Sequence, residues 1–402
     1  MARTKHKARV AGGEGGAGPT AQPGAAGAAQ GAAAAAGQAA DGGPSTSGRL
    51  PDNLELARTR VVCGPDMNLH TTSTIAATQW ASLGVDASFD LDSFRRGFNI
   101  DITRYEGDDM EFEMKGVSCA LANSLRRIMI SEAPTMAIEH VFIVNNTSVI
   151  QDEVLAHRLG LIPLKVDPRL FQYKSKEESP SEHNTIVLKL KVECRRLPNG
   201  SMENECVYSR DLQWLPLGSE MPDETSCRFA SSQEALVPGG VRPVHDDILI
   251  AKMRPGQVIE LECHCIKGVG DEHAKWSPVA TTWYRLMPEV VLLQQPHGDV
   301  ARALAEQLPG LLALQGTGDA ATVTVGDVRK HDKLLEKVRR LSGEEQYKQY
   351  IQLRKIKDHF IFTIESTGAW RPHELFNYAV SVMMSKCDKV LEGLQAFPQR
   401  SF

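Results

Sequence analysis

The stretch SCALANSLRRIMISEAP, residues 118–134, carries the clearest structural signal in this chain. Within it, Leu121, Leu125 and Ile128 recur at spacings of four and three, which predicts a helix with one apolar face over residues 118–132. Small residues lie between them and allow another backbone to approach closely. Pro134 ends the helix, because proline has no amide hydrogen to donate to the preceding turn.

Strand patterns flank this helix on both sides. Before it, Met110, Phe112 and Met114 alternate with acidic residues, which predicts a hairpin over residues 98–114 with this face buried. After it, residues 135–149 alternate again as a strand. Further strands are predicted over residues 186–194, 258–266, 279–286 and 360–364, and a short helix over residues 152–159. This mixture predicts an α+β protein.

The longest predicted helix, residues 372–394, has more apolar surface than one sheet needs. Its apolar side chains step by four and three, a seam typical of a helix that packs along another helix. The seam consists of Phe376, Val380, Met383, Cys387, Val390 and Leu394. A second apolar strip runs beside it. One strip can pack on the chain's own sheet, so the other predicts a partner.

Length and composition exclude several classes of protein. A chain of 402 residues with a net charge of −5 suggests two domains and argues against a dedicated nucleic-acid-binding protein. No apolar run is long enough to predict a membrane-spanning helix. Eight cysteines spread over this length do not form a disulfide scaffold. We therefore expect a soluble intracellular protein that does not contact a membrane.

Two segments have the composition of irregular structure. Residues 11–49 contain no large apolar side chain, which predicts a disordered Ala/Gly-rich tail over residues 1–50, followed by an N-terminal extension over residues 51–93. The basic start of the tail leaves an organelle transit peptide open, although a flexible tail is favoured. Residues 216–243 contain four prolines and a Gly–Gly pair, which indicates a long loop or insertion.

No segment matches a known catalytic or nucleotide-binding motif. Cys263, His264 and Cys265 offer one closely spaced cysteine pair, whereas a zinc site usually has two pairs. Alternation with Glu260 and Glu262 predicts that both cysteines face the core and that His264 forms a solvated ion pair. We expect no metal, no cofactor and no catalytic residue, although a metalloenzyme using this trio stays an alternative.

Other polar clusters favour structural or interface roles. His157 with Arg158, and His273 with Lys275 and Trp276, lack the orienting third group that a catalytic site needs. Residues 329–357 contain ten Lys and Arg against four acids, so an independent nucleic-acid-binding protein stays an alternative. Leucines and tyrosines at helical spacing favour a solvated surface helix there instead.

Four ordered motifs resemble the RNA polymerase alpha family. Residues 123–128 are similar to its N-[AS]-L-R-R-[IV] core, and residues 145–164, 273–280 and 360–368 resemble the archaeal and eukaryotic branch. The resemblance extends from about residue 94 to 394. Residues 151–153, with the asparagines before them, and residues 277–286 favour the larger alpha-like subunits shared by RNA polymerases I and III. The polymerase II counterpart, which has a four-cysteine zinc loop not found here, stays an alternative.

The resemblance implies both an architecture and a role. A discontinuous dimerisation domain of a sheet and two helices, residues 94–133 and 277–402, would be interrupted by an inserted mixed α/β domain, residues 134–276. The chain would be a non-catalytic assembly subunit in the nucleus, including the nucleolus. It would pair with the small alpha-like subunit and recruit the second-largest subunit. It would join the other subunits of polymerases I and III and reach DNA only through the complex.

The resemblance also implies two contact surfaces. The dimer interface would combine the two helices through Leu121, Leu125, Ile128, Phe376, Val380, Met383, Cys387, Val390 and Leu394. The contact with the large subunit would use Arg126 or Arg127, and a second candidate surface is the short helix around His157 and Arg158.

Overall fold

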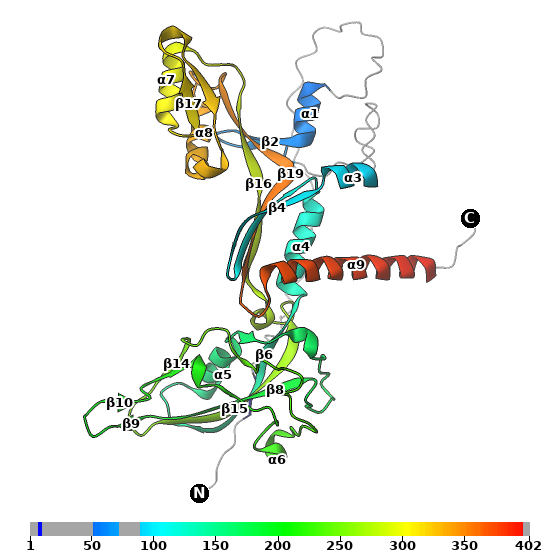
Figure 1. The fold of residues 1–402 in the computed structure, drawn as a ribbon, viewed down its shortest axis with the longest axis vertical. Helices are drawn as coiled ribbons and strands as arrows, with labels where there is room; N and C mark the ends of the chain where they lie inside the picture. The colour runs from blue at the N-terminus through cyan, green and yellow to red at the C-terminus, as the bar shows by residue number, and fades with distance from the viewer. Residues whose placement is uncertain (1–6, 10–50, 72–88, 397–402) are drawn as a thin grey trace, which may run out of the picture.

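The computed structural model describes residues 7–9, 51–71 and 89–396 (Figure 1). The described parts form three levels, with a central sheet between a larger lower lobe and a smaller upper lobe. Of the tail predicted over residues 1–50, only Lys7–Arg9 lies within these ranges. It forms strand β1, antiparallel to strand β6 (Pro134–Asn146). No helix of the described residues is both long and apolar enough to cross a bilayer.

The central sheet is antiparallel and has the order β3-β2-β19-β5-β4, with β16 also paired to β19. Its strands are β2 (Arg60–Cys63), β3 (Asn68–Leu69), β4 (Asn99–Glu106), β5 (Asp109–Lys115), β16 (Val279–Leu292) and β19 (Ile351–Ser366). The predicted β4–β5 hairpin is confirmed, and Met110, Phe112 and Met114 are buried as expected. Gly107 has a φ of 57° in the turn, a value that glycine adopts without steric cost.

Two helices cover one face of this sheet, as predicted. Helix α4 (Cys119–Ser131) begins after Ser118, whose side chain accepts a hydrogen bond from the Leu121 amide. Helix α9 (Pro372–Ala396) follows β19 and packs across α4. Their shared core contains Phe112, Leu125, Ile128, Met129, Phe360, Phe362, Leu375 and Ala379.

The chain leaves the central sheet at Pro134 and returns to it at Val279. Together with β1 from the N-terminal segment, the residues between build a five-stranded antiparallel sheet with the order β1-β6-β15-β8-β12. Its further strands are β8 (Thr185–Glu193), β12 (Gln213–Trp214) and β15 (Val258–Val269), and helix α5 (Asp152–Gly160) packs on β6. The strands predicted over residues 186–194 and 258–266 are therefore confirmed as β8 and β15. This lobe has a hydrophobic core of its own.

Short elements connect the strands of the lower lobe. They are β7 (Leu164–Lys165), η1 (Pro168–Leu170), β9 (Arg195–Arg196), β10 (Met202–Glu203), β11 (Cys206–Tyr208), η2 (Ser209–Asp211), α6 (Pro222–Thr225), β13 (Arg242–Pro243), β14 (Leu249–Lys252) and η3 (Ala274–Trp276). Residues 216–243 contain only α6 and β13, which agrees with the predicted long loop.

The prediction of a solvated His264 is wrong. The exposed fraction of both His264 and Glu262 is 2%. The long loop covers this face of the sheet: the Ser219 hydroxyl donates to a Glu262 carboxylate oxygen at 2.6 Å, and the Glu220 amide donates to the other at 3.1 Å. Cys263 and Cys265 on the opposite face are fully buried, as expected, and burial raises the pKa of the Cys263 thiol.

A third core, which the sequence analysis did not separate, forms the upper lobe. It contains α7 (Gly298–Gln307), β17 (Leu312–Gln315), η4 (Gly318–Ala320), β18 (Thr322–Val325), η5 (Arg329–Leu334) and α8 (Leu335–Leu341). The surface helix predicted for the basic residues 329–357 is wrong beyond Leu341. From Ile351 the chain is strand β19, because Ile351 and Leu353 alternate into this core.

Candidate functional site

Helix α9 changes character halfway along its length. In its first half Leu375 and Ala379 are fully buried against the central sheet, and the Phe376 ring meets the Phe112 ring edge-on at 5.2 Å. Val380 and Met383 also pack against this core but keep part of their surface exposed. The chain's own sheet therefore uses the first half of the helix.

The second half of α9, residues 384–396, is exposed along its whole length and projects away from the sheet (Figure 1). Four apolar side chains there are more than half exposed: Met384, Val390, Leu391 and Leu394. Met384 and Val390 are roughly 120° apart around the helix axis, so the apolar strip is wide. A strip of this width is typical of an amphipathic helix that packs one face against a core, whereas a simple coiled coil needs a narrower one.

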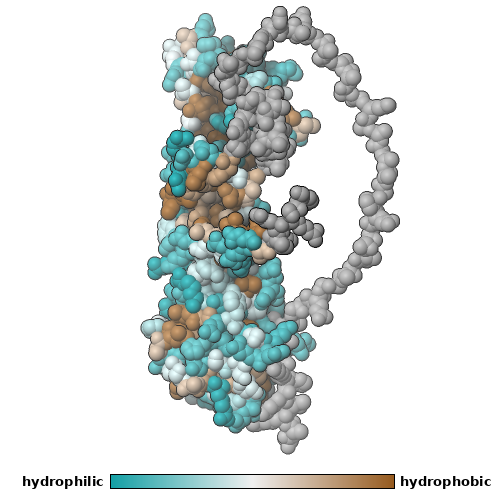
Figure 2. All heavy atoms as spheres, turned by 90° about the vertical axis from the view of Figure 1, so that its right-hand side faces the viewer, coloured by the Kyte–Doolittle hydropathy of each residue, from teal (hydrophilic) through white to brown (hydrophobic). Residues whose placement is uncertain are grey.

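The free half gains its helical start from the packed first half of α9, with which it is continuous. Isolated helices shorter than about 12–15 residues are marginal in water, and an exposed apolar strip adds no stability to them. An ion pair between Lys386 and Glu132, at the end of α4, connects it to the body. Figure 2, viewed from the side to which α9 projects, shows apolar surface gathered at the middle level of the molecule.

Helix α4 contributes less to this surface than the sequence indicates. Leu125 and Ile128 are buried in the chain's own core, at 7% and 4% exposed. Their side chains fill the space between α4 and the sheet, so little of their surface is exposed. Leu121, one turn earlier, is exposed. Cys387 on α9 is exposed as well.

A short helix that the sequence analysis missed extends this surface. Helix α3 (Leu91–Gly97) lies to the same side of the central sheet as the free half of α9 (Figure 1). The Phe94 ring stacks on the Phe98 ring at 5.3 Å and contacts the Phe89 ring at 5.7 Å. Phe89 and Leu91 are at least half exposed. The sequence did contain a signal for this helix: Phe94 and Phe98 are four residues apart, the spacing at which side chains on a helix contact each other.

The two arginines of the α4 motif have different surroundings. The Arg126 guanidinium donates to the Asn123 side-chain oxygen at 3.0 and 3.2 Å and is partly buried. The Arg127 side chain is exposed, and no ion pair involves it within the described ranges. Arg126 is therefore held in place by its own helix, whereas Arg127 is free to meet another molecule.

On α5, the structure separates two neighbouring candidates. The Arg158 guanidinium donates to the backbone oxygens of Leu249 and Ile250, at 2.7 and 3.1 Å, and so attaches α5 to β14. His157 is exposed beside it. The two predicted contact surfaces do not lie side by side. The arginine pair is on α4, in the central level, whereas His157 and Arg158 are on α5, in the lower lobe.

The group around His273 serves the junction between the two large sheets. Lys275 forms an ion pair with Glu139, and its ammonium also donates to the Ile138 oxygen at 3.0 Å. The backbone oxygen of Trp276 accepts from the Thr135 hydroxyl at 2.9 Å. These contacts show the structural role that the sequence analysis favoured.

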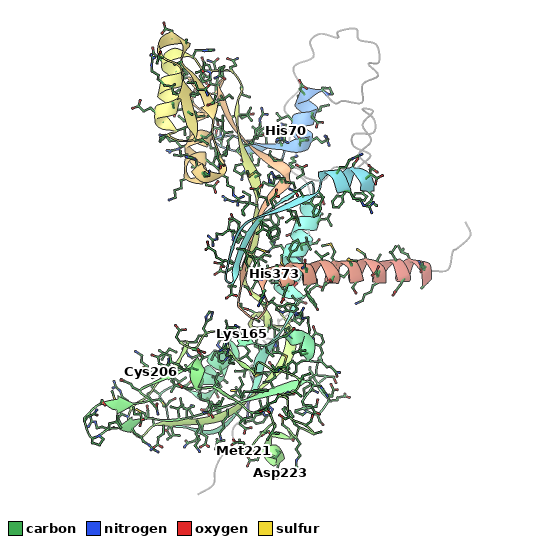
Figure 3. All side chains as sticks on the ribbon, in the orientation of Figure 1. His70, Lys165, Cys206, Met221, Asp223 and His373 are labelled. Carbon is green, nitrogen blue, oxygen red and sulfur yellow. The ribbon has the colours of Figure 1, made fainter. Side chains whose placement is uncertain are left out.

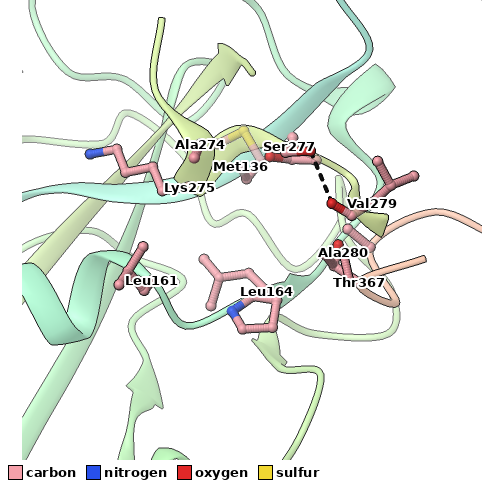
Figure 4. Close-up of a pocket in the computed structure, with 12 residues that line it drawn as sticks. Met136, Leu161, Leu164, Ala274, Lys275, Ser277, Val279, Ala280 and Thr367 are labelled. Carbon is pink, nitrogen blue, oxygen red and sulfur yellow. Dashed lines mark hydrogen bonds between the residues drawn. The ribbon is translucent and has the colours of Figure 1, made fainter. Parts of the chain in front are cut away.

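A cavity of about 220 Å³ lies at this junction (Figure 4). It is lined by the segment that follows α5, by η3 and by the start of β16. Ser277 donates to the Val279 oxygen at 3.0 Å on one wall. The lining includes residues from three of the motifs singled out in the sequence, 145–164, 273–280 and 360–368. The fold therefore brings together segments that lie up to about two hundred residues apart.

The fold and this surface define a class of protein: a chain with a projecting helix, braced on a sheet, that exposes an apolar strip of the kind found at protein interfaces. Comparison with known proteins agrees with this. A family model described as the RNA polymerase Rpb3/Rpb11 dimerisation domain matches residues 111–387. The chain therefore belongs to this RNA polymerase subunit family.

Curated relatives cover most of the chain. The DNA-directed RNA polymerases I and III subunit RPAC1 of Bos taurus is 41% identical over 357 residues, which cover 85% of this chain and 97% of the relative. The protein of the same name in Saccharomyces cerevisiae is 37% identical over 341 residues, 81% of this chain and 96% of that one. The DNA-directed RNA polymerase II subunit rpb3 of Dictyostelium discoideum is 28% identical over 295 residues, which cover 71% of this chain and 91% of that relative.

Proposed function

We propose that this protein is the larger alpha-like subunit shared by DNA-directed RNA polymerases I and III, and that it acts as a non-catalytic assembly subunit for the transcription of ribosomal and small RNAs. The similarity to relatives named as polymerase I and III subunits, which is greater than that to the polymerase II relative, supports this assignment over the polymerase II alternative. Its place would be the nucleus, including the nucleolus.

The proposed architecture is a discontinuous dimerisation domain, residues 94–133 and 277–402, with an inserted domain over residues 134–276. Two observations support it. Separate hydrophobic cores lie in the central and lower levels, and strands on both sides of the insertion, β5 and β16, pair with the same strand, β19. The upper lobe is then a further subdivision, built from part of residues 277–402 together with Cys63 of the N-terminal segment.

The heterodimer with the small alpha-like subunit would use the free half of α9. The exposed apolar strip of residues 384–396 is the single observation that carries this proposal. Full burial of a large apolar side chain contributes about 1.5–3 kcal/mol, so four of them represent a large share of a stable interface. Leu121 and the aromatic rings of α3 would extend the contact.

Recruitment of the second-largest subunit would use Arg127, which is exposed, in preference to Arg126, which is held by Asn123. His157 is the exposed candidate on α5. DNA would be reached only through the complex. The rival nucleic-acid-binding role of residues 329–357 is disfavoured because Arg329 forms ion pairs with Glu111 and Glu113.

The test is purification of the tagged chain from cells under conditions that keep polymerases intact, followed by identification of the associated largest subunits. The largest subunits of both polymerase I and polymerase III are expected. Finding only the polymerase II largest subunit would select the polymerase II alternative, and finding no polymerase subunit would overturn the proposal.

A further inference from the structure

A charged cleft of about 470 Å³ lies between the lower lobe and the start of α9. The lower lobe contributes β7, η1 and the loop that leads into β13, and the central level contributes the connection between β19 and α9. Figure 3 labels Lys165 on the lower side of this junction and His373, at the start of α9, on the upper side. Clefts of this size are typical of ligand or peptide sites.

Two cations stand directly opposite each other in the wall of this cleft. Strands β7 and β13 form an antiparallel ribbon in which Lys165 pairs with Arg242. Like charges at directly opposed positions destabilise a strand pair. Both side chains are exposed, and neither forms an ion pair with any residue that the structure describes. The ribbon therefore carries an unrelieved repulsion at the position where it faces the cleft.

A third unpaired cation enters from the other side. Arg371, the residue before α9, is exposed and has no ion pair among the described residues. By contrast, Arg169 is already neutralised: it binds the Asp167 carboxylate at 2.7 Å and lies 4.9 Å from the centre of the Trp370 ring. In this cleft the charge of Arg169 is therefore balanced by a carboxylate. Three other cations, Lys165, Arg242 and Arg371, have no ion-pair partner among the described residues.

We propose that this cleft binds an acidic segment of a protein partner, with a carboxylate placed between Lys165 and Arg242 and a second near Arg371. A carboxylate at the first position turns the cross-strand repulsion into two charge-assisted hydrogen bonds. This inference is independent of the proposed dimer interface, which lies on the free half of α9.

The surroundings favour a peptide over a nucleic acid. A nucleic acid carries a charge on every phosphate and is bound along a continuous basic surface. Here the carboxylates of Asp167 and Glu374 line the same cleft and would repel neighbouring phosphates. The backbone at Gly239 and Gly240 and the exposed Leu170 side chain give a peptide a surface for backbone and apolar contacts.

The experiment measures binding of fluorescein-labelled hexaglutamate to the purified full-length chain by fluorescence anisotropy at low and at physiological salt. The key variant is Lys165→Glu, which places a carboxylate opposite Arg242 within the chain itself. It is expected to weaken hexaglutamate binding at least tenfold and to raise the melting temperature, because the built-in carboxylate occupies the site. Arg242→Gln, which removes one cation without adding an anion, is expected to weaken binding as well.

Arg196→Glu is the matched control, because it changes the net charge equally on an exposed residue of the β9–β10 hairpin. It is expected to change hexaglutamate binding less than twofold. The proposal is overturned if the unaltered chain does not bind the peptide at low salt, or if Arg196→Glu and Lys165→Glu weaken binding equally. It is also overturned if a single-stranded DNA oligonucleotide displaces hexaglutamate and binds more tightly through the same residues.

Discussion

Lys386 on α9 and Glu132 at the end of α4 form an ion pair that connects the projecting helix to the body of the protein. The pair is partly exposed, so its contribution to stability is small. Its position matters more: it lies near the point where α9 passes from the half that packs on the sheet to the exposed residues 384–396. The angle at which the apolar strip is presented is therefore set by the chain itself before any partner binds.

The first prediction concerns this strip. The double substitution Val390→Glu and Leu394→Glu is expected to weaken association with the small alpha-like subunit at least a hundredfold, since two apolar contacts are lost and two charges are buried. Co-purification and titration of the two purified chains measure it. Both side chains are more than half exposed in the free chain, so its melting temperature should not change.

Lys389→Glu is the control for that pair, because Lys389 is exposed on the opposite side of the helix. It should leave association nearly unchanged. Val380 and Met383 are poorer positions for such a test, since both pack against the core of the chain and a charge there also damages the fold. Full association of the double variant would remove the strip from the interface.

A second prediction tests the central core. Phe362 is fully buried in β19, and its ring stacks on the Phe112 ring at 5.2 Å from the adjacent strand. Replacing Phe362 by Ala is expected to destabilise the chain by about 3–5 kcal/mol, through lost burial and the cavity that remains. Urea unfolding followed by circular dichroism measures the change. A loss below about 1 kcal/mol would mean that this pair is not part of a tightly packed core.

Two glycines, one before α9 and one within it, give a third prediction, in which the two substitutions change stability in opposite directions. Gly368, before α9, has a φ of 88°, and a Cβ there would lie 2.4 Å from a Val244 methyl group. Gly368→Ala should destabilise the chain by about 1–3 kcal/mol. Gly393, within the free half of α9, has open space around its Cα, so Gly393→Ala should increase helicity and stability by up to about 1 kcal/mol. Thermal unfolding of the two variants, compared with the unaltered chain, measures both effects.

Acidification gives a fourth prediction, at the contact between the upper lobe and the central sheet. Burial by itself raises the pKa of the Glu113 carboxyl, but the hydrogen bond from His359 and the charge of Arg329 outweigh it and lower the pKa below the ordinary 4.5. An acid with a lowered pKa in the folded state stabilises the protein above its unfolded pKa. This stability is lost as the pH falls through the folded value.

The unaltered chain should therefore lose stability as the pH falls below about 4.5 and through the lowered pKa of the folded Glu113 carboxyl. Glu113→Gln should be less stable than the unaltered chain at pH 7 and should show a shallower loss on acidification. Urea unfolding at a series of pH values measures the difference. Parallel pH profiles for the two proteins would show that Glu113 does not stabilise the contact.

Local sequence patterns predicted most of the central level correctly. The alternation of Met110, Phe112 and Met114 and the three-four spacing of Leu121, Leu125 and Ile128 identified β5 and α4, because one face of β5 and most of one face of α4 are buried. The family resemblance could also be recognised from short motifs. The upper lobe was not predicted, because its core combines Cys63 from the N-terminal segment with residues far along the chain.

The sequence by itself determined that α9 carries more apolar surface than one sheet can cover. This could be read from the spacing of its apolar residues, because the period of a helix depends only on the local chain. Only the tertiary structure decided which part of that surface is left free: Leu375 and Ala379 meet the sheet, whereas Val390 and Leu394 extend beyond its edge. The same holds for His264, which alternates like a surface residue but is buried because a distant loop folds over it. Periodicity gives the side of an element on which a residue lies, and burial depends on which other segments cover that side.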